Sequence, residues 1–460
     1  MNFVGTLFAK HALLATGWAK DIRIKIGANG TIDAIEINAT PQAHDVNLTN
    51  RALLPAPSNL HSHAFQRAMA GLTEYRSAAR DNFWTWRKLM FKFADILSPD
   101  DAETIAAFVQ MEMLEAGYAA SGEFHYLHHQ AEGVPYDDPA EMANRMVAAA
   151  ETSGIGLTLL PVLYRRGGLD DSPLSSGQSR FGCTHDLYEK LISSAQNSIT
   201  MLGADSTIGV APHSLRAVSK DDLKWVQTLL PDAPVHIHVA EQTIEVDDVI
   251  EAYGARPVQW LMDNNAVDSR WCLIHATHMN ESEVSQLANS GAVVGLCPIT
   301  ESNLGDGIFE ATKYLSSGGL IGFGSDSNIR ISLSEELRTL EYSQRLRDRT
   351  RAVLVDGDMS VGRNLFEAVS KGSAQAMNRN SGQIAVGQLA DLLTLDTDSI
   401  HTTGLEEDKL LDGWIFAGDD NLVRDVFSAG RHLVVDGQHK NHSSISGKFH
   451  ATINKLRQSL

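Results

Sequence analysis

Four polar side chains that follow apolar runs are of the types that together bind a divalent metal. His61 and His63 form a His-Ser-His segment at the end of one run. Residues two apart in a strand point to the same side, so both imidazoles face one point. His238 and Asp326 end two other runs. Three imidazole nitrogens and a carboxylate oxygen suit zinc with a position left for water, whose pKa such an ion lowers to about 7.

Glu241 and His275 are the candidates for proton transfer. Glu241 lies three residues after His238, where a general acid or base could reach a substrate, and His275 ends a further apolar run. The structural alternatives are a first-turn carboxylate that stabilises the next helix for Glu241 and a helix cap for Asp326. His236 lies deeper in its run, and we expect it to be a hydrogen-bonded core histidine.

The elements that must position these residues are short apolar runs that alternate with helical stretches. Continuous apolar runs are typical of parallel strands buried on both faces, and amphipathic stretches such as 101–116 and 139–152 fit the crossovers. The candidate strands cover residues 52–63, 119–126, 156–164, 207–214, 235–241, 271–278, 292–300 and 320–326. Eight such units predict an α/β fold with a (β/α)₈ TIM barrel and its active site at the carboxyl ends of the strands. An open doubly wound sheet is the alternative, but no GxGxxG follows the first run.

Both ends of the chain have the period-two alternation of β-strands. Residues 1–50 alternate and contain an Asn29-Gly30 turn, and residues 385–440 have a similar pattern. We therefore expect residues 1–52 and 380–460 to form a small composite β-sandwich domain around a catalytic barrel of residues 53–379. A long Gly/Ser-rich stretch after the third predicted strand, residues 165–182, is expected to be a loop over the active-site face.

The net charge and the cysteine content argue against several classes of function. The formal net charge is −19, which argues against a nucleic-acid or anionic-membrane surface, since both need a basic footprint. The 3 cysteines include no CxxC pair, so a disulfide framework or a cysteine zinc site is not expected, and a reducing compartment fits. No secretory signal or membrane span is visible, and we expect a cytoplasmic protein. An acidic substrate would need locally placed arginines.

The order HxH, HxxE, strand-ending His and Ser-Asp resembles the amidohydrolase superfamily, and residues 386–392 resemble the return segment of many members. No carbamylated-lysine pattern is evident, which favours the mononuclear deaminase branch. Three longer strings, NLHSHAFQRAM at 59–69, FWTWR at 83–87 and EFHY at 123–126, are similar to the formimidoylglutamate deiminases. This resemblance covers nearly the whole chain.

The resemblance implies one divalent metal ion, zinc, and hydrolysis of N-formimino-L-glutamate to N-formyl-L-glutamate and ammonia in histidine degradation. It implies the metal ligands His61, His63, His238 and Asp326, the catalytic residues Glu241, His275 and Asp326, and the substrate-binding residues Gln66, Arg87, Tyr126, His213 and Arg216. A small dicarboxylate partner fits the two arginines, because a guanidinium binds carboxylate in bidentate fashion. Without the resemblance, an ordinary ion pair is the simpler interpretation of each arginine.

Two other functions are left open by the residues. A related deaminase acting on a purine or pyrimidine ring such as guanine would keep the metal ligands and want aromatic stacking in place of two arginines. A non-catalytic scaffold would be expected to have lost a ligand or Glu241, and none is lost here. The metal bound in the cell, loop closure and the oligomeric state, with a homodimer among the options, are not fixed by the sequence.

Overall fold

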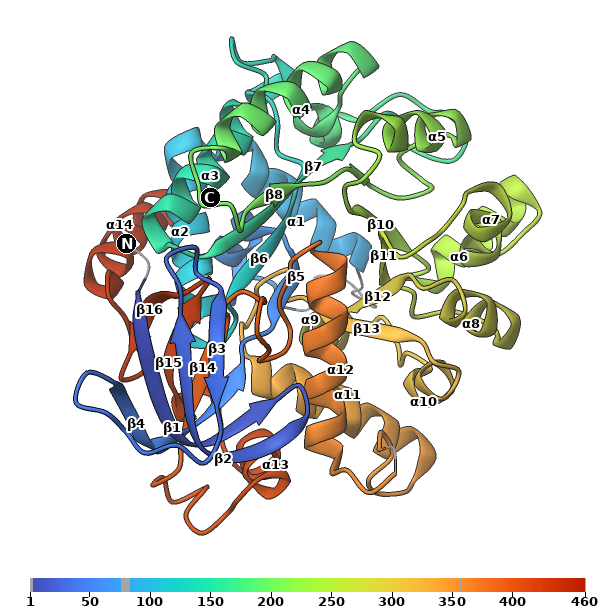
Figure 1. Ribbon diagram of the computed structural model, residues 1–460. Helices are drawn as coiled ribbons and strands as arrows, with labels where there is room; N and C mark the ends of the chain where they lie inside the picture. Colours follow the sequence, from blue (N-terminus) through green and yellow to red (C-terminus); the bar gives the residue numbers. More distant parts are fainter. Residues whose placement is uncertain (1–2, 76–82, 356, 460) are drawn as a thin grey trace.

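The computed structural model describes residues 3–75, 83–355 and 357–459 of the 460-residue chain (Figure 1). Two parallel sheets lie at its centre. One contains β5 (Ser58–Ser62), β6 (Ala120–His125), β7 (Gly156–Leu163) and β8 (Thr207–Ile208), with β9 (Ala211–Pro212) paired to β7. The other contains β10 (Val235–Val239), β11 (Trp271–His275), β12 (Val293–Leu296) and β13 (Leu320–Phe323). The predicted α/β fold with parallel strands is confirmed, and each predicted run contains one or two of these strands.

Isolated bridges join the two sheets at both of their outer edges. Ser62, at the end of β5, pairs with Asp326, just after β13. Ser214, just after β9, pairs with His238 of β10, and a second bridge lies on the same side. The strands therefore follow one another around a ring, which brings their carboxyl ends to one face. An open doubly wound sheet would leave two unpaired edges, so this arrangement disagrees with that alternative.

Helices follow the strands and cover the outside of the ring (Figure 1). They are α1 (Phe83–Ile96), α2 (Pro99–Glu115), α3 (Glu141–Ser153), α4 (His185–Ile199), α5 (Lys220–Leu229), α6 (Thr243–Tyr253), α7 (Pro257–Asn264), α8 (Glu281–Ala288), α9 (Pro298–Leu304), α10 (Ala311–Ser316), α11 (Leu333–Asp348) and α12 (Val361–Ala376). The predicted stretches 101–116 and 139–152 correspond to α2 and α3. Ser98 and Asp101 form a capping box around Pro99, which starts α2 two residues earlier than predicted.

Both ends of the chain share one eight-stranded sheet. Its order is β17 (Gln438–His439), β16 (Arg431–Val435), β15 (Val423–Ser428), β14 (Leu392–Asp396), β4 (Val46–Pro55), β1 (Gly5–Leu14), β2 (Gly17–Ile26) and β3 (Ile32–Glu36). In Figure 1 the blue amino-terminal strands lie beside the red carboxyl-terminal ones. β4 pairs in parallel with β1 and antiparallel with β14, so it joins the two ends, and it runs almost directly into β5. The sandwich architecture and the domain limits stay predictions.

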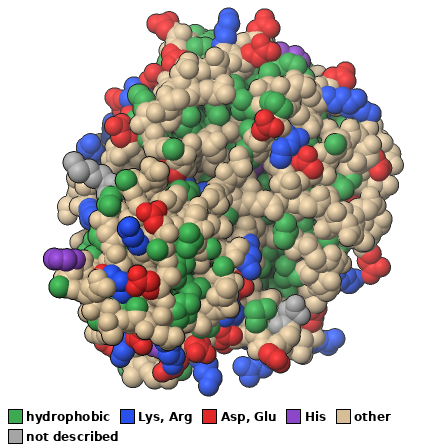
Figure 2. All heavy atoms as spheres, viewed as in Figure 1, with side chains coloured by type: hydrophobic (Ala, Val, Ile, Leu, Met, Phe, Trp, Pro, Cys, Tyr) green, Lys and Arg blue, Asp and Glu red, His purple; other side chains and the backbone are tan. Residues whose placement is uncertain are grey.

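Two helices of the carboxyl-terminal segment, α13 (Asp408–Ala417) and α14 (His442–Arg457), complete the fold. α14 packs on α2, where the rings of Phe108 and Phe449 stack with centroids 3.8 Å apart. Side chains of both charges are spread over the face drawn in Figure 2. Among the described residues, no helix has the length and apolar character needed to cross a bilayer. All 3 cysteines are buried and unpaired, as expected.

Candidate active site

The backbone turns sharply where the strands reach the central cavity. Ala240, His275 and Asp326 have φ of 52°, 69° and 47°, a left-handed conformation that is unusual outside glycine. Such strained residues cluster at functional sites, where the surrounding structure holds them. Gly324 also matters locally, because a Cβ there would lie 2.5 Å from the Cβ of His61. The missing side chain lets β13 approach β5 and brings Asp326 to the histidines.

The four predicted metal ligands meet in one place, which we call the four-ligand cluster: His61, His63, His238 and Asp326. Their ligand atoms all lie within 4.8 Å of one another, and all four residues are buried. The Nε2 atom of His61 lies 3.2 Å from that of His63 and 3.1 Å from that of His238. One carboxylate oxygen of Asp326 lies 3.4 Å from Nε2 of His61 and 3.3 Å from Nε2 of His63.

Hydrogen bonds on the outer side of His63 and His238 determine which ring nitrogen faces the centre of the cluster with a free lone pair. Nδ1 of His63 lies 2.9 Å from the carbonyl oxygen of Phe124, and Nδ1 of His238 lies 3.1 Å from that of His213. A carbonyl only accepts, so each Nδ1 donates, and in the neutral ring Nε2 keeps its lone pair. Lone pairs at such distances, beside a carboxylate, repel one another unless a cation lies between them. The donor set therefore fits a divalent cation, and its nitrogen and oxygen types suit zinc.

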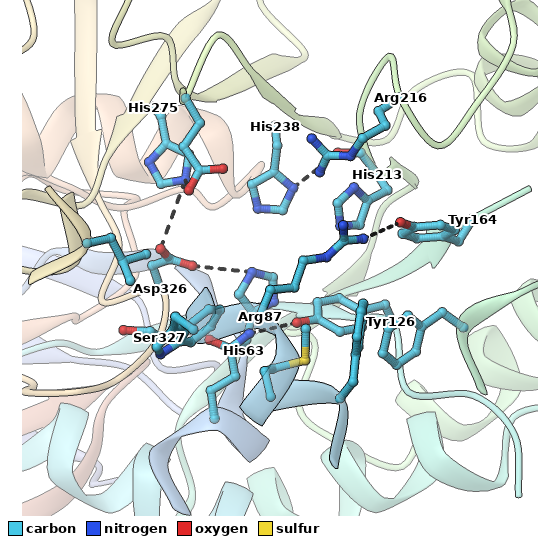
Figure 3. Close-up of a pocket in the computed structure, with 17 residues that line it drawn as sticks. His63, Arg87, Tyr126, Tyr164, His213, Arg216, His238, His275, Asp326 and Ser327 are labelled. Atoms are coloured by element: carbon cyan, nitrogen blue, oxygen red, sulfur yellow. Dashed lines mark hydrogen bonds and ion pairs between the residues drawn. The ribbon is translucent and has the colours of Figure 1, made fainter. Parts of the chain in front are cut away.

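Glu241 and His275 lie beside the four-ligand cluster. Figure 3 shows His275 next to His238 and Asp326. Nε2 of His275 lies 3.9 Å from a carboxylate oxygen of Glu241 and 4.0 Å from one of Asp326. Burial raises the pKa of Glu241 to about 7, although the nearby His275 opposes the shift. Burial also lowers the pKa of His275, but the surrounding carboxylates, Glu241 first, outweigh this and raise it to about 10. The pair can thus hold and exchange protons beside the cluster.

All five predicted substrate-binding residues line one cavity: Gln66, Arg87, Tyr126, His213 and Arg216. Gln66 donates to the Tyr126 hydroxyl at 2.6 Å, and Arg87 donates to the Tyr164 hydroxyl at 3.0 Å. Burial lowers the pKa of the Arg87 guanidinium, and the positive charge of Arg216 lowers it further while Tyr164 opposes both. Two cations next to one cavity favour an anionic ligand (Figure 3).

Several lining residues are absent from the sequence-based set. Tyr164 directly follows β7, so the strand-end rule used for the histidines could have found it. Trp86 and Phe181 form part of the wall, and Phe181 ends a 3₁₀ helix (Ser176–Phe181) inside the stretch predicted as a loop. Glu301, in α9, lies 3.1 Å from Nδ1 of His275 and had no distinguishing pattern in the sequence.

The structure supports a structural role for His236 and disagrees with one for Glu241 and Asp326. His236 bonds through Nε2 to the Ala376 carbonyl at 2.8 Å, which confirms the prediction of a hydrogen-bonded core histidine. Glu241 precedes Gln242, the N-cap of α6, and it lines the cavity, so its position differs from that of a first-turn carboxylate. Asp326 lies six residues before Ser332, which caps α11, and it joins the four-ligand cluster.

Comparison with known proteins places these features in a family. The amidohydrolase family model matches residues 52–433, and the model of the formimidoylglutamate deiminase N-terminal domain matches residues 4–47. A formimidoylglutamate deiminase from Pseudomonas aeruginosa is 47% identical over 98% of this chain and 100% of its own. A 5-methylthioadenosine/S-adenosylhomocysteine deaminase from Natronomonas pharaonis is 25% identical over 84% of this chain and 81% of its own.

Solved structures agree with this assignment. The crystal structure of an amidohydrolase from Brucella melitensis has a TM-score of 0.94 and 45% identity, covering 98% of this chain and 99% of that one. An adenosine deaminase from Xanthomonas campestris with bound zinc has a TM-score of 0.82 at 21% identity, covers 98% of both chains, and shares the fold. The chain therefore belongs to the amidohydrolase family and, within it, to the formimidoylglutamate deiminases.

Proposed function

We propose that this protein hydrolyses N-formimino-L-glutamate to N-formyl-L-glutamate and ammonia, a step of histidine degradation. It is then a zinc-dependent hydrolase that acts on a C–N bond of a linear amidine, built on a (β/α)₈ barrel. The observation that carries the proposal is the four-ligand cluster at the floor of a cavity that also holds two arginines. The 47% identity to a formimidoylglutamate deiminase over the whole chain supports it. A cytoplasmic location and a homodimer stay predictions from the sequence.

The metal would be held by His61, His63, His238 and Asp326. A divalent cation supplies a polarising positive charge that makes water a strong nucleophile near neutral pH. The carbonyl acceptors on Nδ1 of His63 and His238 keep these two rings oriented toward the cation. Such outer partners commonly change metal affinity by about 10–100-fold when they are removed.

We assign the proton transfers to three side chains. Asp326 accepts a proton from the attacking water, whose oxygen adds to the formimino carbon. Nε2 of His275 faces Glu241 and Asp326 and stabilises negative charge on that oxygen. Glu241 passes one proton to the imino nitrogen and Asp326 returns the second, so that this nitrogen leaves as ammonia when the C–N bond breaks. The hydroxyl proton of the adduct goes back to Glu241, and its oxygen becomes the formyl carbonyl. General acid–base catalysis of this kind contributes about 10²–10⁴-fold to a rate.

Substrate recognition is assigned to the cavity wall. N-formimino-L-glutamate carries two carboxylates, and Arg87 and Arg216 each offer a planar fork of donors. Gln66, Tyr126 and His213 add neutral hydrogen-bonding groups around the same volume. The local positive charge explains how a chain with a net charge of −19 can bind a dianion.

Ring deamination is the second candidate, since Trp86, Tyr126 and Phe181 could stack on a purine. The deciding experiment gives the purified protein N-formimino-L-glutamate, guanine and 5-methylthioadenosine in parallel, and measures ammonia and formamide. We expect ammonia, without formamide, from N-formimino-L-glutamate alone. Ammonia from a purine together with none from N-formimino-L-glutamate would replace the proposal with the second candidate.

Arg87→Ala and Arg216→Ala test the dicarboxylate assignment. Each should lower kcat/KM by about 10–150-fold, since a hydrogen bond to a charged group is worth about 1.5–3 kcal/mol. The matched control is Arg165→Ala, because Arg165 pairs with Asp222 at 3.3 Å and is not a lining residue. With N-formimino-4-aminobutyrate, which lacks the α-carboxylate, one of the two variants should lose its effect. Unchanged kcat/KM in both variants contradicts the assignment.

A further inference from the structure

Glu301 is a buried carboxylate that the proposed mechanism does not use, and it lies on the far side of the His275 ring from the reaction volume. It belongs to the first turn of α9, which follows β12, and it is 6% exposed. Its Oε1 atom lies 3.1 Å from Nδ1 of His275. The opposite ring atom, Nε2, is the one that faces Glu241 and Asp326.

We propose that Glu301 is the positioning residue of His275: by accepting the Nδ1 hydrogen, it fixes the ring plane and keeps Nε2 aimed at the reacting oxygen. The inference rests on the proposed function for its catalytic consequence. A hydrogen bond to the second ring nitrogen sets the tautomer and orientation of an imidazole, and a carboxylate behind a catalytic histidine is a recurrent way to provide it.

The surroundings make Glu301 a rigid anchor. The same Oε1 atom accepts the backbone N–H of Cys297 at 2.9 Å, which ties the carboxylate to the start of its own helix. The preceding residue, Thr300, donates to the carbonyl oxygen of Ser325 at 3.2 Å and so holds α9 against the end of β13. The Ile299 N–H donates to Glu336 at 2.8 Å and fixes the helix from behind. Hydrogen bonds at Cys297, Ile299 and Thr300 thus fix the position of the Glu301 carboxylate.

His275 itself needs such support. It has a left-handed backbone with φ of 69°, and Ala276 follows with φ of 47°, so the ring leaves a strained strand end. The side chain is 1% exposed, so water does not compete for Nδ1. The simpler alternative is that Glu301 only caps α9 through the Cys297 N–H. That role would affect folding and leave the His275 ring unchanged.

Two substitutions separate these roles. Glu301→Gln keeps an oxygen where Oε1 is and removes the charge, whereas Glu301→Met keeps the length and removes the acceptor. We expect kcat to fall about 10-fold in Glu301→Gln and about 100-fold in Glu301→Met, by analogy with the effect of about 10–100-fold found for partners behind metal-ligating histidines. KM and zinc content should stay within about twofold of wild type, since neither variant changes a cavity residue or a member of the four-ligand cluster.

The matched control is Glu336→Gln, which weakens the same helix start at Ile299. It should lower Tm and leave kcat near the wild-type value. If Glu336→Gln lowers kcat as much as Glu301→Met does, the placement of α9 alone matters and the proposal is overturned. The same conclusion follows if both Glu301 variants lose Tm while keeping wild-type kcat.

A readout without substrate keeps the test independent of the proposed function. Long-range ¹H–¹⁵N spectra of ¹⁵N-histidine-labelled wild-type protein report which ring nitrogen of His275 carries hydrogen, with the signal assigned from its loss in His275→Asn. We expect a hydrogen on Nδ1 that shifts in Glu301→Gln. An Nδ1 without hydrogen in the wild type overturns the proposal. Absence of N-formimino-L-glutamate turnover by the wild type would refute the proposed function and leave this ring measurement valid.

Discussion

Two buried polar groups lie near opposite ends of the parallel strands, and they differ in how their charges are balanced. At the carboxyl ends, the four-ligand cluster places three imidazole nitrogens around one carboxylate. At the amino ends, Arg379 binds Asp391 through two hydrogen bonds of 2.6 and 2.9 Å and Asp205 at 3.1 Å, and Arg431 binds Asp205 at 2.6 and 2.8 Å. We call this second group the ion-pair cluster.

The ion-pair cluster is complete within the protein. Two guanidinium groups face two carboxylates, so the charges cancel and the donors meet acceptors. It joins residues around α12, the segment before β8 and the terminal sheet, which fits a structural role. The four-ligand cluster brings the acceptor nitrogens of His63 and His238 together with the carboxylate of Asp326, and a divalent cation would balance them. Burial of charge therefore does not by itself mark a functional site; an imbalance of donors and acceptors does.

The largest expected effect comes from breaking the four-ligand cluster. Asp326→Asn removes its one negative charge and the proposed proton acceptor, so we expect zinc loss and a fall in activity at least as large as the 10²–10⁴-fold typical of a lost acid–base group. Elemental analysis measures the zinc content, and ammonia release measures the activity. Asp205→Asn, from the ion-pair cluster, is the control that should keep both zinc and kcat. Retention of full zinc and near-wild-type activity by Asp326→Asn would rule out the metal assignment.

A smaller effect, on stability alone, is expected at the ion-pair cluster. Arg379→Met leaves Asp391, whose side chain is fully buried, without its bidentate partner. Removing one member of a buried pair costs about 3–5 kcal/mol of unfolding free energy. Urea denaturation measures this loss of unfolding free energy, and the zinc content of Arg379→Met should equal that of wild type. Arg330→Met, at a pair whose arginine is 57% exposed, should change the unfolding free energy by less than about 1 kcal/mol. Equal costs for the two would contradict the distinction.

The smallest expected effect is an acid dependence of the same cluster. Burial raises the pKa of Asp205, but the hydrogen bond from Arg431 and the charge of Arg379 outweigh it and lower the pKa to about 2. Since the ordinary value is about 3.9, ionised Asp205 stabilises the fold above about pH 4, and this contribution, about 2–3 kcal/mol, is lost as the pH falls through about 2. The stability advantage of wild type over Asp205→Asn should shrink over that range. Asp398→Asn, at an exposed site, should show no such trend.

Local patterns were sufficient for much of the fold and for choosing the residues that form the four-ligand cluster. The apolar runs predicted the parallel strands because a strand buried on both faces leaves a continuous apolar signature. His61 and His63 could be paired from their spacing, since a strand repeats every two residues. His238 and Asp326 could be added because polar residues that end buried strands are costly unless they bind something.

Glu301 shows where local patterns fail. In the sequence it is an ordinary acidic residue in the first turn of a short helix, a position that carboxylates favour for electrostatic reasons alone. Its contact with His275 spans 26 residues and two elements, and nothing in the spacing predicts it. The ion-pair cluster is similar, since Arg379 and Asp205 lie 174 residues apart.

The amino-acid sequence thus determined which side chains could bind a metal and which strands would carry them, because residue type and short-range periodicity are local properties. Only the tertiary structure decided which lone pairs face one another, which ring nitrogen of His63, His238 and His275 has a carbonyl or carboxylate behind it, and which buried charges already have partners. These depend on distances between strands far apart in the chain, which are fixed when the ring of strands closes and side chains pack to ångström precision.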